Sequence, residues 1–227
     1  MKTPESHLIF FGDQEKQSLS LDARRQKLGA WVRTYLSGQG RKILDIGCWN
    51  GDFLRMLPPN WDKWGVDFQR HPDLPEEVHF LEADIEESFP PELSNFDCIF
   101  AGEIIEHVHA TQLFLERCRH VLKPGGLLIL TTPNLSCWLN LWRWWSLGQP
   151  YCVNSDTGQD GHVRYLAPLT LRSSLAEAGF QILEMGSAGG VEFFKAFPHL
   201  SRRVFRLFPM RGKNLMVVAR KPKEPQP

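Results

Sequence analysis

The chain has 227 residues, of which 42% are hydrophobic, enough to form the core of one substantial domain. Its formal net charge is zero, and it carries no recognisable nucleic-acid-binding module, so nucleic acid is not an expected partner. The first residues do not form a secretory signal, and no run of about 18 apolar residues is present. We therefore expect a cytoplasmic protein without a membrane span.

Charge is distributed unevenly along the chain. Residues 1–110 contain 19 acids against 11 Lys and Arg, whereas residues 111–227 contain 7 acids against 15 Lys and Arg. This contrast favours a positively charged ligand near the first half and an anionic partner near the second. Uneven surface charge without any partner is the alternative. The five cysteines lack Cys-x-x-Cys spacing, which favours a reducing compartment.

The first half of the chain alternates between helical and strand patterns. Apolar spacing over 21–36 predicts a helix that stops at Gly38, so we treat 1–39 as an N-terminal helical segment. Five strands are predicted at 42–46, 63–67, 78–82, 96–101 and 127–132. Helices are predicted at 52–57 and 111–122, the second stopped by Lys-Pro-Gly-Gly at 123–126. Such alternation with apolar strands predicts a mostly parallel sheet covered on both faces.

The pattern changes after residue 133. A Trp-rich segment at 134–147 precedes a polar loop at 148–162, a helix at 168–178, and strands at 180–185 and 214–219. Helical numbering places Trp138, Leu141, Trp142 and Trp145 on one face, which predicts packing in a core or a cap. We expect a domain at 40–220 with cap elements at 134–165 and 187–212, and a disordered tail at 221–227.

The segment 43–51, Ile-Leu-Asp-Ile-Gly-Cys-Trp-Asn-Gly, carries an apolar strand into a glycine-punctuated loop. Glycines allow a backbone to approach a ligand closely, and open α/β sheets bind nucleotides at the carboxyl ends of their strands. Asp67 ends the next strand, where an acidic side chain can accept hydrogen bonds from ribose hydroxyls. These features predict a nucleoside-cofactor site.

Six motifs follow one another between residues 40 and 185. They are 44–48 with Gly51, Asp67, Ala-Asp-Ile at 83–85, Phe-Asp-Cys-Ile at 96–99, Glu-Ile-Ile-Glu-His-Val at 103–108, and Leu-Lys-Pro-Gly-Gly at 122–126. Their order and spacing resemble the class I S-adenosylmethionine-dependent methyltransferases, specifically the group related to the ubiquinone-biosynthesis O-methyltransferases. The resemblance implies a doubly wound, mostly parallel seven-stranded sheet of Rossmann-like methyltransferase fold with a helical cap. A dehydrogenase-type domain would need Gly-x-Gly-x-x-Gly, which this chain lacks.

The resemblance implies S-adenosylmethionine as the cofactor and assigns roles around its methionine and ribose parts. Gly47 and Gly51 would bring the loop backbone against these parts. Asp45 would support the loop and the amino end of the cofactor, and Asp67 would hold the ribose hydroxyls. For the two aspartates, a carboxylate that only caps a loop is the alternative.

Three further positions are implied at the adenine and at the entrance. Asp84 and Ile85 would flank the adenine, with the carboxylate on its exocyclic amine. Glu103 would lie near both the cofactor and the acceptor. A loop-capping carboxylate is again the alternative for Asp84.

Trp49 departs from the family pattern, which usually has glycine there. If the position needs a positive φ, a bulky residue costs about 1–2 kcal/mol. The loop therefore runs differently, or the indole packs over the cofactor pocket, or binding is impaired. In the last case the chain would be an inactive methyltransferase-like scaffold, which is our alternative function.

Two histidines are the candidate catalytic residues. Methyl transfer to a hydroxyl or amine needs a group that removes its proton, and histidine suits this role near neutral pH. His107 follows the fourth strand. The resemblance places His162, with Arg164, on the acceptor side of the cleft. The alternatives are a histidine bonded only to backbone and a pair that pins a loop to the sheet.

Metal and partner assignments depend largely on the resemblance. In related ubiquinone-pathway enzymes Glu103, Glu106 and His107 would match a group linked to a divalent metal, but we predict no metal here. The acceptor is expected to be a small molecule, sugar or lipid-linked compound methylated at oxygen. The stretch 195–213 has six Lys and Arg and no acid among large apolar residues. Peripheral contact with a membrane surface and an ordinary cap over the cleft are its two interpretations.

Overall fold

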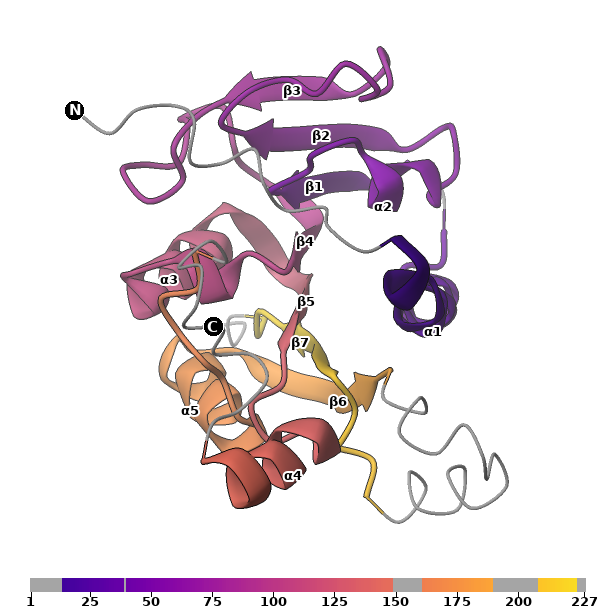
Figure 1. Cartoon of the computed structure of the whole chain (residues 1–227). Coiled ribbons are helices and arrows are strands. Elements are labelled where there is room, and N and C mark those ends of the chain that lie inside the picture. Colours follow the sequence, from indigo (N-terminus) through magenta and orange to yellow (C-terminus); the bar gives the residue numbers. More distant parts are fainter. Residues whose placement is uncertain (1–13, 39, 149–160, 190–207, 224–227) are drawn as a thin grey trace, which may run out of the picture.

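The computed structural model of the chain describes residues 14–38, 40–148, 161–189 and 208–223. Its centre is one seven-stranded sheet with the order β3-β2-β1-β4-β5-β7-β6 (Figure 1). The strands are β1 (Lys42–Ile46), β2 (Asp62–Asp67), β3 (His79–Glu82), β4 (Phe96–Gly102), β5 (Leu122–Pro133), β6 (Gln181–Ala188) and β7 (Asn214–Arg220). Neighbours are parallel except at β7, which is antiparallel to both β5 and β6. The predicted doubly wound, mostly parallel sheet is therefore confirmed.

Helices cover both faces of the sheet. They are α1 (Gln14–Tyr35), α2 (Asp52–Arg55), η2 (Ile105–His107), α3 (Thr111–Val121), α4 (Trp138–Leu147) and α5 (Pro168–Glu177). Successive strand residues point to opposite faces, so Leu44 joins a core with α3 and α5, whereas Ile43 joins a core with α1 and α2. Two apolar layers thus fix the positions of the loops that leave the strands.

The Lys-Pro-Gly-Gly segment at 123–126 ends α3 as predicted, but β5 begins earlier than expected. Phe96 pairs with Leu122, whereas Cys98 pairs with Leu127, so the register shifts between these pairs. Gly125 has a φ of 82°, a conformation that strains residues with a side chain. The irregular segment is therefore an extension of β5, whose regular pairing resumes at Leu127.

Of the two environments predicted for the Trp-rich segment, a core or a cap, the core is wrong for the second half of the segment. Asn140 is the buried residue of α4, while Trp142 and Trp145 are 49% and 86% exposed. Helical numbering identifies a shared face, but it does not reveal whether another element covers that face. Residues 149–160, 190–207 and 224–227, which belong to the predicted cap and tail, lie outside the described residues. Of the helices described, none is long and apolar enough to cross a membrane.

Asp97 ties together the amino-terminal edge of the sheet. It accepts hydrogen bonds from the Lys42 amide at 2.8 Å and the Lys123 ammonium at 2.9 Å. Burial alone would raise the pKa of Asp97, but these donors, together with Arg41, outweigh it and lower that pKa. A lowered folded-state pKa means that ionised Asp97 stabilises the fold above the unfolded-state value, and that this stability is lost as pH falls through the folded-state pKa.

Asp97→Asn is expected to lower the free energy of unfolding at pH 7 by about 1–3 kcal/mol, because charged donors lose their ionised partner. Urea denaturation at pH 7 measures this loss, with Glu92→Gln at an exposed position as the control. The difference from the unsubstituted protein should shrink at acid pH. Equal denaturation midpoints at pH 7 would contradict the stabilising role of Asp97.

Candidate functional site

The connections leaving β1 and β4 meet at the point where the strand order reverses. From β1 the chain proceeds to β2 and β3 on one side, and from β4 to β5 on the other. A Cβ added at Gly47, after β1, would lie 3.0 Å from Cδ1 of Ile104, after β4. Because open α/β sheets bind ligands outside the carboxyl ends at this reversal, the two loops define the candidate site.

The loop after β1 requires left-handed backbone at three of its five positions. Gly47, Trp49 and Gly51 have φ values of 71°, 43° and 79°. Trp49 thus takes the conformation that glycine would adopt without strain, so the loop does not avoid it by running differently. The Trp49 amide donates to Asp67 Oδ2 at 2.8 Å, and its ring packs 4.4 Å from the ring of His71. The indole therefore lies on the β2 side of the site.

Gly51 has a structural reason of its own to be glycine. It precedes α2 as a left-handed cap, and an added Cβ would lie 2.8 Å from Leu74 Cδ1 and 3.0 Å from Pro75 Cδ. The β2–β3 connection therefore packs directly on this position. The predicted close approach of Gly51 to a cofactor would be a second reason for glycine at this position.

Asp45 and Asp67 form an acidic pair below the loop. Asp45 is only 3% exposed, and burial, followed by the negative charge of Asp67, raises the pKa of Asp45 well above its ordinary value. Asp67 accepts the Trp49 amide on Oδ2 and the Phe68 amide on Oδ1, both at 2.8 Å. A carboxylate offers about four lone-pair sites, so Asp67 caps the loop and still has acceptor capacity for two hydroxyls.

The two residues assigned to the adenine lie just beyond β3. Asp84 Oδ1 accepts the Glu86 amide at 2.8 Å, which closes a turn and leaves acceptor capacity on the carboxylate. The Ile85 side chain is 6% exposed and packs in the core, and its carbonyl accepts from Arg117. Any contact of Ile85 with adenine therefore falls mainly to its backbone.

Glu103 takes an unusual conformation at the end of β4, with a φ of 54°. Its carboxylate accepts from Thr131 Oγ1 at 2.7 Å and Asn214 Nδ2 at 2.9 Å, and pairs with Arg24 of α1 at 3.1 Å. These partners direct the carboxylate to β5, β7 and α1. The metal alternative weighed from the sequence grouped Glu103 with Glu106 and His107, whereas the structure places His162 beside the latter two.

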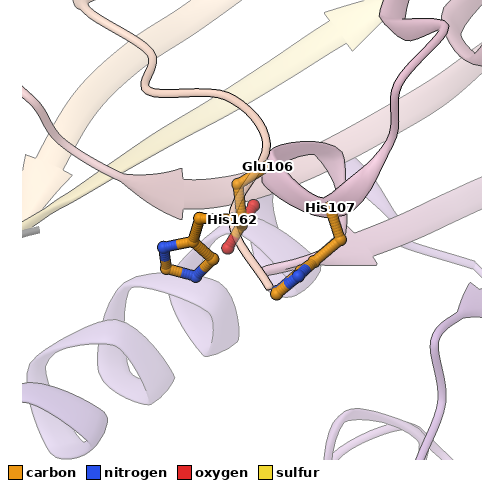
Figure 2. A group of neighbouring side chains, drawn as sticks. All are labelled: Glu106, His107 and His162. Carbon is orange, nitrogen blue, oxygen red and sulfur yellow. The ribbon is translucent and has the colours of Figure 1, made fainter. Parts of the chain in front are cut away.

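Figure 2 shows Glu106, His107 and His162 gathered at the end of β4. One ligand atom from each lies within 4.8 Å of the others. Glu106 is 1% exposed; its Oε2 accepts from Thr132 Oγ1 at 2.9 Å, and its Oε1 has no hydrogen-bond partner among the described residues. Burial, followed by the charge of Glu103, raises the pKa of Glu106 well above its ordinary value. One carboxyl group and two imidazoles could also hold a borderline divalent cation.

Backbone hydrogen bonds place His162 beside His107. The amides of Val163 and Arg164 donate to the Glu106 carbonyl at 2.9 and 3.1 Å. His107 Nδ1 lies 3.2 Å from the Gly161 carbonyl oxygen, and the two imidazole centroids are 4.8 Å apart. The Arg164 guanidinium donates to the His109 carbonyl at 2.5 Å, as expected for a residue that pins a loop. Both histidines are candidate catalytic residues from the sequence, and these backbone contacts bring their distant segments together.

Comparisons with known proteins agree with this architecture. Residues 16–185 match the sequence family described as a methyltransferase domain. The chain is similar to the mitochondrial ubiquinone biosynthesis O-methyltransferase of Rattus norvegicus, with 33% identity over 108 residues, 42% of this chain and 31% of the rat protein. It is also similar to the ubiquinone biosynthesis O-methyltransferase of Chelativorans sp. (strain BNC1), with 30% identity over 151 residues, 62% of this chain and 59% of that protein.

A solved structure extends the likeness over most of the fold. A putative S-adenosylmethionine-dependent methyltransferase from Listeria monocytogenes aligns with a TM-score of 0.64 at 14% identity, covering 91% of this chain and 100% of that one. This confirms the predicted Rossmann-like methyltransferase fold. The sequence match spans only about a third of the rat protein, at 31% of its length.

Proposed function

This chain belongs to the methyltransferase domain family, which matches residues 16–185, and we propose that it transfers a methyl group from S-adenosylmethionine to an acceptor oxygen. One observation carries the proposal: the Asp45–Asp67 pair, at the carboxyl ends of β1 and β2, and the His107–His162 pair, beyond the end of β4, lie at the same edge of the sheet. Oxygen is proposed because similar proteins are named O-methyltransferases. A small molecule, sugar or lipid-linked compound is the proposed acceptor.

The acidic pair suits the cofactor. S-adenosylmethionine, when bound, supplies a methyl group on a positively charged sulfur. Asp67 would accept the ribose hydroxyls on the lone pairs that the Trp49 and Phe68 amides leave. Asp45, buried beside Asp67, would face the amino end, where a positive charge favours its carboxylate form. Asp84 would accept a hydrogen bond from the exocyclic amine of adenine, on the lone pairs that the Glu86 amide leaves.

His107 is the proposed base. A carbonyl oxygen can only accept, so the contact with Gly161 places the proton of neutral His107 on Nδ1 and the lone pair on Nε2. Bound S-adenosylmethionine would supply the methyl group and leave as S-adenosylhomocysteine, and Nε2 of His107 would take up the proton of the acceptor hydroxyl. His162, packed at a 63° interplanar angle against this ring, would orient it and line the acceptor side.

Two experiments test the proposed activity. Cell extract incubated with the protein and an isotopically labelled methyl donor should yield a labelled acceptor, identified by mass spectrometry. Calorimetry with S-adenosylhomocysteine should give a binding isotherm. Folded protein that releases no heat at high micromolar ligand would favour the inactive scaffold instead, in which Trp49 obstructs the site.

Asp45→Asn is expected to raise stability at neutral pH while it weakens ligand binding. The folded state raises the pKa of Asp45 above its unfolded value of 3.8. The free energy of unfolding therefore falls as pH rises from the unfolded-state pKa through the folded-state pKa of Asp45. The amide does not ionise, and the variant should gain on the order of 1 kcal/mol at pH 7. Urea denaturation at pH 7 and pH 4 measures the gain, which should shrink at the lower pH. A variant less stable than the unsubstituted protein at pH 7 would contradict the proposed cost of ionising buried Asp45.

The same substitution tests the amino-end assignment. Affinity for S-adenosylhomocysteine should fall as pH falls in the unsubstituted protein, because the ligand ammonium favours ionised Asp45. Calorimetry of Asp45→Asn should show weaker binding and a flatter pH dependence. Asp52→Asn, at an exposed position on α2, is the control. Parallel pH profiles in Asp45→Asn and unsubstituted protein would remove Asp45 from the amino end.

A further inference from the structure

The second half of α4 presents a large apolar surface to solvent. We call this surface the α4 patch; its members and their exposed fractions are Leu141 (40%), Trp142 (49%), Trp144 (56%), Trp145 (86%) and Leu147 (60%). Single exposed apolar residues are ordinary, but a contiguous group that includes three indoles marks an interaction surface. In Figure 1, α4 lies at the lower end of the molecule.

The first turn of α4 holds the helix in place. The Trp138 amide donates to the Arg211 carbonyl at 3.2 Å, and the Trp138 ring meets the Phe208 ring edge-on at 5.4 Å. Buried Asn140 donates through Nδ2 to the Asn134 carbonyl at 3.0 Å. The helix is therefore anchored at one end, and the α4 patch projects from the anchored turn.

The breadth of the α4 patch favours a lipid surface as its occupant. At 100° per residue, its side chains occupy about 220° of the helix circumference. An amphipathic helix that packs against a protein typically presents a stripe of roughly 100°. Lipid headgroups and acyl chains surround an inserted helix on several sides, which matches the wider distribution.

Charge favours the same occupant. The described residues 134–148 and 208–223 contain Lys and Arg but no Asp or Glu. Arg143 lies within α4, and the Arg211 guanidinium lies 6.0 Å from the Trp138 ring centroid. Tryptophan and arginine together suit the boundary between headgroups and acyl chains, and cations attract anionic lipid. A second copy of the chain would instead bring two cationic surfaces together.

We propose that the α4 patch docks this chain on an anionic lipid surface. Trp144, Trp145 and Leu147 enter the headgroup–acyl boundary, while the cations near the first turn face the headgroups. The segment before α4 also adjoins the candidate site, because Asn134 forms a parallel bridge with Leu166, four residues after His162. This inference goes beyond the proposed methyl transfer and does not require it.

Cosedimentation of the full chain with vesicles tests the docking surface. The vesicles consist of phosphatidylcholine alone or phosphatidylcholine mixed with phosphatidylglycerol. The unsubstituted protein should sediment with the mixed vesicles, and Trp144→Ser/Trp145→Ser/Leu147→Ser should lower the partition coefficient by about a hundredfold. Leu113→Ser, a substitution of a 44% exposed residue on α3, is the matched control and should bind like the unsubstituted protein.

Several results would overturn the docking surface. They are no cosedimentation of the unsubstituted protein with mixed vesicles, undiminished binding by the triple variant, and an equal loss in Leu113→Ser. Equal binding to pure phosphatidylcholine would overturn the anionic preference. A dimer in sedimentation equilibrium that the triple variant dissociates, without vesicle binding, would assign the patch to a second copy. Calorimetry on the same variants tests the proposed function separately. Their affinity for S-adenosylhomocysteine should equal that of the unsubstituted protein.

Discussion

His107→Ala is expected to lower kcat for methyl transfer by about 10²- to 10⁴-fold, the usual contribution of a positioned general base. The affinity for S-adenosylhomocysteine should change little, because the aspartates assigned to that ligand lie at the ends of β1 and β2 and just beyond β3, outside the segment that carries His107. The contact between His107 Nδ1 and the Gly161 carbonyl fixes the orientation of the ring. Removal of the ring therefore removes both the proton acceptor and its alignment. Initial rates with the acceptor identified by labelling measure the loss.

His109→Ala is the matched control, because His109 is an exposed histidine two residues further on that bonds to Glu86. It should retain nearly full activity. The activity of His162→Ala should fall between those of the two variants, since the His162 ring packs against His107 and is not the proposed proton acceptor. A His107→Ala variant with an unchanged kcat would exclude the proposed base, and a large loss of cofactor affinity would move its role to binding.

The sheet could be predicted closely from the sequence because each strand is a short, nearly continuous apolar run. Parallel strands buried on both faces need such runs, and they stand out between polar turns. The same logic located Asp67, since a charged residue that ends an apolar strand lies at the carboxyl edge of the sheet. The end of α3 could also be predicted, because proline and glycine are energetically unfavourable within a helix.

The catalytic cluster could be predicted only in part, because its members come from distant segments. The resemblance grouped Glu103 with Glu106 and His107 as the metal alternative, but Asn214 and Thr131 hold Glu103 in another direction. His162 arrives through backbone hydrogen bonds to the Glu106 carbonyl. Contacts between backbone groups leave no pattern of residue types, so the position of His162 beside Glu106 cannot be derived from a single sequence. The orientation of Glu103 depends on partners from distant strands and cannot be derived either.

The exposure of α4 was missed for a related reason. Hydrophobic periodicity reports which side chains share a face, and it assumes that the protein itself covers that face. Trp145 is 86% exposed, so this assumption fails for α4. Apolar side chains that stay exposed beside a well-packed turn indicate a surface that an external partner covers.

Asp67→Ala should cause the largest loss of cofactor affinity among the substitutions considered. Loss of the ribose hydrogen bonds alone costs about 1–3 kcal/mol, or roughly five- to 150-fold in affinity. The Trp49 amide also loses its acceptor, and that amide belongs to a residue at a φ of 43°. The β1 loop should therefore lose its preferred shape as well. Calorimetry with S-adenosylhomocysteine measures the sum, and Asp73→Ala on the exposed β2–β3 connection is the control.

A comparison of ligands separates the two contributions of Asp67. Adenosine retains the ribose hydroxyls, whereas 2′,3′-dideoxyadenosine lacks them. If Asp67 binds the hydroxyls, Asp67→Ala should weaken adenosine binding more than dideoxyadenosine binding, because only the first ligand loses hydrogen bonds. If Asp67 only caps the loop at Trp49, both ligands should weaken equally, since both depend on the same loop. The ratio of the two losses therefore decides between a residue that contacts the cofactor and one that shapes its site.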